Sequence, residues 1–392
     1  MIKMAKAQFV IKDRFQKGGR YQDLLTTSIL TDVCEKITGQ SDYEVEFLDE
    51  VNKGRQAKLI FNNSVTYISF SENKVTSRNS SFQSFPSALI NYCNEANKNK
   101  NICYYILPTQ ANIETDYFIF MYRLMKTVGT KFLNESERLS IQVEPFSSFE
   151  DIILHKNKIR KRNSGNNSSY ITKSSNNTIQ VFGKLYGANK YETSLLCLAL
   201  YYTSNLDIEL FEIEEGNLKK LPQSARDYLL SLDRFKIINA TITMEETEFQ
   251  TNDSLRSPRY IYNLLERLGD KKCAFCNCDI PQLIDGAHIL PVAEIKDDSN
   301  LNLDEKLKKA IDGNNGIWLC KNHHKLLDSN ILKINSDGKL KIKSDLDETS
   351  RDYIDNITSI NQLSEEILTS KFIEYIGKRN EHIQCSQYNI LA

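Results

Sequence analysis

Two short pairs of metal-binding residue types constrain this chain more than any other feature of its sequence. Cys273 and Cys276 form a C-x-x-C pair, and Cys320 and His323 form a C-x-x-H pair. Each pair can turn two soft or borderline ligands toward one point, and four such ligands satisfy tetrahedral zinc. A full set of protein ligands leaves no open position, so the pattern predicts a structural zinc site. Buried free thiols are the alternative, and Cys278 is close enough to replace one ligand.

The second pair is followed at once by another histidine. The chain holds only five histidines, yet His323 and His324 are adjacent. Neighbouring side chains of a helix point in different directions, so zinc binding by the first leaves the second for a separate role. Asp328 lies four residues beyond His324, on the same helical face, where a carboxylate can orient a metal-binding imidazole. A partly exposed histidine capped by an acid is the alternative interpretation.

Two further residues complete a motif. His288 comes shortly after a polar Asp-Gly pair. Asn315 lies between His288 and His324 and is followed by a glycine. The order His288, Asn315, His324, set between the two ligand pairs, resembles the HNH endonucleases of the ββα-metal type. The resemblance covers residues 256–345, and 372–383 is similar to the helix that often closes this domain in restriction-type members. In that family a hairpin carries the first histidine, and a following helix carries the last.

The resemblance implies a role for each residue. His288 would be the general base that activates water, a task suited to an imidazole with a pKa of about 6.5. His324 would hold a divalent ion, Mg²⁺ or Mn²⁺, together with oxygen ligands. Asn315 would order the loop that aims His288, or bind the ion itself; a simple Asn-Gly turn is also compatible. Many members have Asp or His as a metal ligand where this chain has Ala287. Asp285, on the same strand face, is the expected substitute ligand.

The whole chain is predicted to be α+β, with an N-terminal mixed α/β recognition region, a C-terminal ββα-metal nuclease domain and a helical tail. Residues 1–154 alternate β-branched and aromatic runs with helical patterns and form the expected DNA-recognition region. Residues 155–178, rich in Asn and Ser, predict a basic loop or linker. Residues 179–250 predict a helical continuation of the recognition region. The nuclease domain at 255–345 and the tail at 346–392 follow.

The expected loop begins with a run of basic residues. They are candidates for contacts with DNA phosphates: Lys156, Lys158, Arg160, Lys161 and Arg162. A solvated charged surface is the alternative interpretation. The formal net charge of the chain is −1, so no global field attracts nucleic acid and any binding depends on local patches.

Hydropathy argues against a membrane protein. The longest apolar run, at 195–202, is much shorter than the roughly 20 residues of a membrane-spanning helix. The first twenty residues lack the continuous apolar segment of a secretory signal. We therefore expect a cytoplasmic protein, in which scattered cysteines stay reduced.

These features predict a metal-dependent endonuclease of double-stranded DNA, with a structural zinc ion and a catalytic Mg²⁺ or Mn²⁺. The favoured hypothesis is a bacterial restriction enzyme with sequence-specific recognition by the N-terminal region. One alternative is a modification-dependent or anti-phage effector nuclease. Another is a zinc-stapled DNA-binding protein with a decayed nuclease site, which Ala287 allows. A homodimer, and a cognate methyltransferase without stable binding, are the further partners considered.

Overall fold

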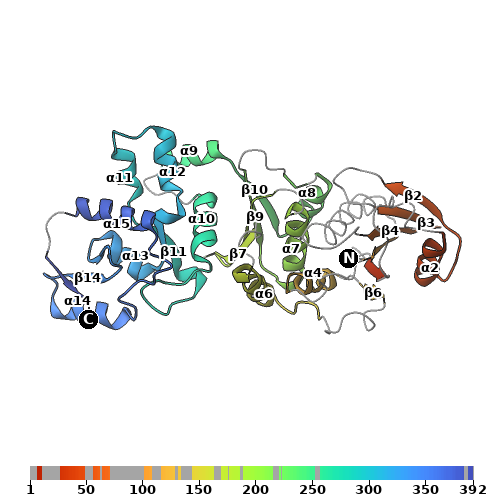
Figure 1. The fold of residues 1–392 in the computed structure, drawn as a ribbon, viewed down its shortest axis with the longest axis horizontal. Helices are drawn as coiled ribbons and strands as arrows, with labels where there is room; N and C mark the ends of the chain where they lie inside the picture. The colour runs from red at the N-terminus through yellow and green to blue at the C-terminus, as the bar shows by residue number, and fades with distance from the viewer. Residues whose placement is uncertain are drawn as a thin grey trace. The chain divides into compact units, whose positions relative to one another are not determined.

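The chain is α+β, as predicted, and it divides into two units that alternate along the sequence (Figure 1). Unit 1 comprises Met1–Ser169, Lys184–Leu210 and Asn217–Ile237, and unit 2 comprises Tyr170–Gly183, Phe211–Gly216 and Ile238–Ala392. The computed structural model describes residues 7–10, 27–48, 56–61, 64–70, 101–107, 116–128, 131–133, 144–162, 169–174, 176–185, 189–214, 220–221, 223–251, 257–383 and 387–391. Within these residues, no helix combines the length and apolar character needed to cross a membrane.

Unit 1 contains a six-stranded sheet with the order β2-β3-β4-β5-β1-β6. Its strands are β1 (Ala7–Val10), β2 (Glu44–Leu48), β3 (Gln56–Phe61), β4 (Ser64–Phe70), β5 (Asn101–Leu107) and β6 (Lys131–Leu133). The strands β2, β3 and β4 pair antiparallel, whereas β4, β5, β1 and β6 run parallel. Parallel pairing needs crossover connections, so the mixed α/β character expected of the N-terminal region is present.

The helices of unit 1 include three that pack against one another. Among the described residues of this unit, the helices are α2 (Thr27–Thr38), α4 (Asp116–Thr127), α6 (Phe149–Arg162), α7 (Asn189–Thr203) and α8 (Gln223–Leu230). Contacts among α4, α6 and α7 bury Phe120, Ile152 and Leu196 completely. The apolar run at 195–202 forms the C-terminal half of α7, and most of its residues are buried.

The prediction of a loop at 155–178 is wrong at its start and in its middle. Helix α6 continues to Arg162, because Ile152 and Ile159 lie on one helical face and are both buried. The strand β7 (Ser169–Lys173) then follows.

The basic run therefore lies on a helix, and one of its members is buried. Lys156 is 3% exposed, and its Nζ lies 2.7 Å from Oε1 of Glu192. Its charge is used inside unit 1, which corrects the expectation that it contacts DNA. Lys158 is exposed, whereas the side chains of Arg160, Lys161 and Arg162 lie outside the described residues.

The prediction of a helical region at 179–250 is also only partly right. Besides α7, α8 and α9 (Ile242–Thr251), it contains the strands β8 (Ile179–Gly183), β9 (Ile208–Ile213) and β10 (Phe235–Ala240). These strands join β7 in a sheet with the order β10-β9-β8-β7. Their β-branched and aromatic residues favour a pleated, buried surface over a helix.

A hairpin and a helix form the centre of unit 2. Strand β11 (Ile284–His288) pairs antiparallel with β12 (Gly316–Cys320), and α13 (Lys321–Asp328) follows at once. This is the ββα order expected for residues 255–345. The connection between the strands contains α11 (Val292–Asp297), α12 (Leu303–Ala310) and the 3₁₀ turn η3 (Gly313–Asn315).

Helix α10 (Pro258–Leu268) packs closely against this hairpin. Its N-cap Ser257 accepts hydrogen bonds from two backbone amides, and Pro258 occupies the first turn. A Cβ atom added to Gly286 would lie 2.5 Å from Cδ1 of Leu264, and one added to Gly316 would lie 2.3 Å from the hydroxyl of Tyr260. Glycine at these two paired strands lets the helix approach the hairpin.

The tail is helical, as predicted, and ends in a short strand that was not predicted. Its helices are α14 (Glu348–Ile357) and α15 (Ser370–His382). The strands β13 (Leu332–Ile334), β14 (Leu340–Lys343) and β15 (Tyr388–Ile390) form an antiparallel sheet. Phe372 and Ile376 of α15 are buried in the same core as the hairpin. The tail is therefore part of unit 2 and not an appendage.

Candidate metal centre and active site

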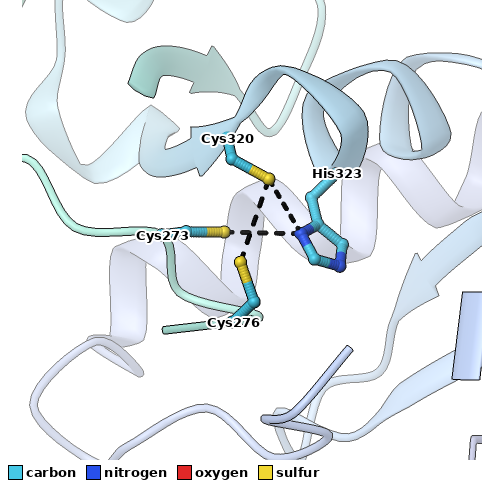
Figure 2. Close-up of side chains that lie close together, drawn as sticks. All are labelled: Cys273, Cys276, Cys320 and His323. Atoms are coloured by element: carbon cyan, nitrogen blue, oxygen red, sulfur yellow. Dashed lines mark hydrogen bonds between the residues drawn. The ribbon is translucent and has the colours of Figure 1, made fainter. Parts of the chain in front are cut away.

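The two predicted ligand pairs converge on one point (Figure 2). The ligand atoms of Cys273, Cys276, Cys320 and His323 all lie within 4.8 Å of one another. Nδ1 of His323 is 3.1 Å from Sγ of Cys320 and 3.5 Å from Sγ of Cys273. Sγ of Cys276 is 3.9 Å from Sγ of Cys320. Zn–S bonds of about 2.3 Å and Zn–N bonds of about 2.0 Å place tetrahedral ligands roughly 3.5 to 3.8 Å apart, so the cluster fits zinc.

Burial sets the protonation of these ligands when no metal is bound. Burial raises the pKa of Cys273 to about 12 and raises that of Cys276. Without a cation these thiols stay protonated, whereas zinc binding requires the thiolate forms and supplies the compensating charge. The fourth ligand, His323, is fully buried, and burial lowers its pKa to about 4, so its imidazole is neutral and able to bind metal.

The hydrogen bond of His323 to Thr358 was not predicted. Nε2 of His323 lies 3.0 Å from Oγ1 of Thr358. Because Nδ1 faces the cysteines as a ligand, Nε2 carries the proton and donates a hydrogen bond to the hydroxyl. Such a bond fixes the orientation and tautomer of a metal ligand. Thr358 follows α14 and is far from the ligands in sequence, so no local spacing indicates it.

Cys278 is outside the ligand group. Its backbone carbonyl accepts a hydrogen bond from the amide of Cys273 at 2.9 Å, which closes the loop between the first two ligands. Among the described residues, the only group of three or more His, Cys, Asp or Glu whose ligand atoms converge is the four-residue cluster, which does not include Cys278. The alternative ligand set is therefore not the one that the structure assembles.

A cavity of about 620 Å³ in unit 2 brings the proposed catalytic side chains together. It is lined by His288 and Asp285 of β11 and by His324 and Asp328 of α13. Asn315 is not among the lining residues. The hairpin and the helix therefore direct one histidine each toward the same space, as the order of the motif predicts.

The imidazole of His288 is held in one orientation and one tautomer. Its Nε2 lies 2.8 Å from the carbonyl oxygen of Ala310, and its ring stacks on Tyr260 with centroids 4.0 Å apart. A carbonyl only accepts hydrogen bonds, so Nε2 carries the proton and Nδ1 keeps a free lone pair. Burial lowers the pKa of His288 to about 4, which leaves it neutral at pH 7. A neutral, oriented imidazole can accept a proton from water.

The amide of Asn315 is fully used by the backbone. Its Oδ1 accepts from the amide of Leu290 at 2.8 Å, and its Nδ2 donates to the carbonyls of Leu290 at 3.1 Å and Lys309 at 3.3 Å. Asn315 is completely buried. Of the two roles expected for this residue, these bonds favour ordering the loop after His288 over binding an ion.

His324 lies between two carboxylates. Its Nδ1 is 3.8 Å from Oδ2 of Asp285, and its Nε2 is 3.4 Å from Oδ2 of Asp328. The side chain of His324 is 28% exposed, so ions and water can reach it. Ala287, by contrast, is completely buried and contributes no polar group. On β11, the carboxylate beside His324 is therefore that of Asp285.

Two arginines, the half-buried Arg267 and the buried Arg379, connect the motif to the helices around it, and neither was predicted. Arg267 of α10 donates to the carbonyls of Gly313 and Gly316, each at 2.8 Å. Arg379 of α15 donates to the carbonyl of Ile289 at 2.9 Å and to that of Leu327 at 2.5 Å. Both arginines bind backbone beside the proposed catalytic residues, so α10 and α15 stabilise the site.

Comparison with known families identifies one region of the chain. Residues 273–335 match the family model of HNH endonucleases. No curated protein matched the chain in a sequence search. The matched region begins at the first cysteine of the cluster and contains all four of its ligands, together with both histidines of the cavity.

Proposed function

We propose that this chain, in which residues 273–335 form an HNH endonuclease domain, is a restriction endonuclease that hydrolyses phosphodiester bonds of double-stranded DNA. The observation that carries the proposal is the meeting of His288, His324 and Asp285 in one cavity beside a complete zinc-type ligand cluster. A nuclease follows from the domain itself. Restriction activity and recognition by the rest of the chain are the proposed refinements.

In the proposed reaction, Nδ1 of His288 accepts a proton from the attacking water. The bond from Nε2 to Ala310 and the stack on Tyr260 hold the ring in one orientation at the cavity. The new P–O bond forms as the bond to the leaving oxygen breaks, and water protonates the leaving group. A divalent ion, Mg²⁺ or Mn²⁺, would stabilise negative charge on the phosphate and on the leaving oxygen.

The geometry around His324 supports one arrangement of ligands for that ion. Nδ1 of His324 faces Oδ2 of Asp285, and both atoms would bind the ion. Nε2 then carries the proton and donates to Asp328, which orients the ring. Asp285 is the protein carboxylate expected to replace the ligand that Ala287 cannot provide.

We further propose that unit 1 recognises DNA and that the exposed part of α6 contacts phosphates. Lys158 is exposed on this helix, and Arg160, Lys161 and Arg162 follow it in sequence. Neutralising Lys158, Arg160 and Arg162 together should weaken binding to all DNA sequences and flatten its salt dependence, because phosphate contacts release counterions. Filter binding at several salt concentrations measures both effects, and an unchanged slope would contradict this role.

The alternative functions differ in the DNA that they cut. A modification-dependent or anti-phage effector nuclease would use the same site on a different substrate. A DNA-binding protein with a decayed site is less well supported, since Asp285 lies beside His324 despite Ala287. A cytoplasmic location, a homodimer, and a separate methyltransferase that protects host DNA complete the proposal.

The test is cleavage of unmethylated and methylated phage DNA by the purified chain with Mg²⁺ or Mn²⁺. Discrete fragments from unmethylated DNA support a restriction enzyme, cleavage of methylated DNA alone supports the modification-dependent alternative, and binding without cleavage supports the decayed site. His288→Ala should lower cleavage by about 10²-fold or more while DNA affinity stays within a few fold. His382→Ala, at a histidine outside the cavity lining, is the matched control.

A further inference from the structure

The side chains that line the cavity of His288 and His324 include only one lysine or arginine among the described residues, Lys271. The carboxylates of Asp285 and Asp328 line the same cavity. A divalent ion would offset the charge of these two carboxylates and no more. A phosphodiester brings a further negative charge, which grows in the transition state and needs a positioned cation.

We propose that Lys271 binds the phosphate at the scissile bond and stabilises its negative charge during cleavage. This inference rests on the proposed endonuclease function and adds a catalytic residue to it. Neither the zinc ligands nor the His288, Asn315 and His324 motif includes this lysine.

The fold holds Lys271 between two fixed points. It follows Gly269, the C-cap of α10, and precedes Cys273, the first residue of the metal cluster. The carbonyl of Gly269 accepts a hydrogen bond from Nε1 of Trp318 at 3.2 Å. A short segment anchored at both ends positions a lysine more narrowly than a free surface loop does.

The aromatic ring of Trp318 provides a surface for the lysine side chain. Nζ of Lys271 lies 5.7 Å from the centroid of the Trp318 ring, within the range of a cation–π interaction. Trp318 is 2% exposed and pairs with Gly286 in the β11–β12 hairpin. The only tryptophan of the chain thus connects the lysine to the strand that carries Asp285 and His288.

A different role for Lys271 would be to balance the charge of Asp285. In that case removal of the lysine would change the concentration of Mg²⁺ required for activity, and the rate at saturating Mg²⁺ would stay normal. Contact with the phosphate makes the opposite prediction, because the transition state loses a cation that added metal does not replace. The rate at saturating Mg²⁺ therefore separates the two roles.

The experiment is single-turnover cleavage of the phage DNA that the wild type cuts, at saturating protein and Mg²⁺. Lys271→Met should lower the rate by about 10²-fold or more, as expected for the loss of one group that stabilises transition-state charge. Zinc content should be unchanged and DNA affinity should stay within a few fold. Lys271→Arg should recover part of the rate because it keeps the charge. Lys272→Met, at the exposed neighbour, is the matched control and should cut within about 2-fold of wild type.

A Lys271→Met rate within about 3-fold of wild type at saturating Mg²⁺ would overturn the inference while leaving the endonuclease function intact. A change confined to the Mg²⁺ requirement would overturn it in favour of charge balance with Asp285. If the wild type cuts none of the DNA substrates, the proposed function fails, and the role of Lys271 fails with it. Should Lys271→Met lose zinc, Lys271→Gln takes its place and is judged by the same rates.

Discussion

His323 and His324 are consecutive residues of one helix and have opposite surroundings. His323 is completely buried, with Nδ1 3.1 Å from a cysteine sulfur and Nε2 bonded to Thr358. His324 is 28% exposed and lies between Asp285 and Asp328. Successive side chains of an α-helix project about 100° apart, so a single step along α13 separates the two environments. The same residue type therefore lies in a closed ligand cluster at one position and in an accessible cavity at the next.

The cluster that contains His323 and the cavity that contains His324 also differ in ligand chemistry. Three sulfurs and one nitrogen close the buried cluster, which suits zinc and leaves no position for substrate. The cavity offers carboxylate oxygens and imidazole beside open space, which suits a harder ion that keeps water or substrate as ligands. The contrast leads to variants that should affect one region and spare the other.

The largest effect is expected in the buried cluster. Cys320→Ser should lose zinc, unfold unit 2 and abolish cleavage, because structural zinc contributes about 10 to 16 kcal/mol in small domains, as much as the whole stability of a typical protein. Elemental analysis and circular dichroism measure the first two losses. Cys278→Ser, outside the cluster, should keep its zinc. Folded, active Cys320→Ser protein without zinc would show that the cluster is not structural.

The paired variants His323→Ala and His324→Ala test the comparison directly. His324→Ala should lower cleavage by about 10²-fold to 10³-fold, since the proposed function makes it a ligand of the catalytic ion, with zinc content and melting temperature nearly unchanged. His323→Ala should lose zinc and melt at a lower temperature. Metal analysis and thermal unfolding of the two proteins provide the comparison. Equal zinc loss in both would remove the distinction drawn here.

A smaller effect is expected from the hydroxyl that orients His323. Thr358→Val keeps the shape of the side chain but removes the acceptor of the Nε2 proton. Zinc affinity should fall by about 10-fold to 100-fold, the usual effect of losing a hydrogen bond to a metal ligand. Competition with a chelator measures the affinity. Thr349→Val, at an exposed threonine in the first turn of α14, serves as the control, and equal affinities in both variants would contradict the role.

The smallest effect concerns pH. His288 acts as a base only when unprotonated, and burial lowers its pKa to about 4. At saturating metal, the single-turnover rate should therefore change by less than about 2-fold between pH 7 and pH 5. A histidine with the usual pKa near 6.5 would lose about 25-fold over the same range. A fall of that size, absent in His288→Ala, would show that the base in the working enzyme is an ordinary, hydrated histidine.

Short sequence spacings were sufficient to predict the zinc-type ligand cluster. The two ligand pairs and the different directions of His323 and His324 follow from local geometry, which a few residues determine. The order of hairpin and helix was expected only from the resemblance to HNH endonucleases. Prediction was weaker at 155–178 and 179–250, where Asn and Ser suggested loops and an apolar run suggested helices. Tertiary burial of Ile159 in a helix, and pairing of β8 and β9 in a sheet, overrode those local preferences.

The sequence by itself determined which side chains can bind metal and accept protons, because residue type and spacing limit that chemistry. Only the tertiary structure decided their partners. Thr358 reaches His323, Tyr260 stacks on His288, and Lys271 lies over Trp318 across long distances in sequence. Packing of α10, α14 and the hairpin in one core brings these pairs together. Such contacts depend on how separate elements pack, so a local sequence pattern cannot predict them.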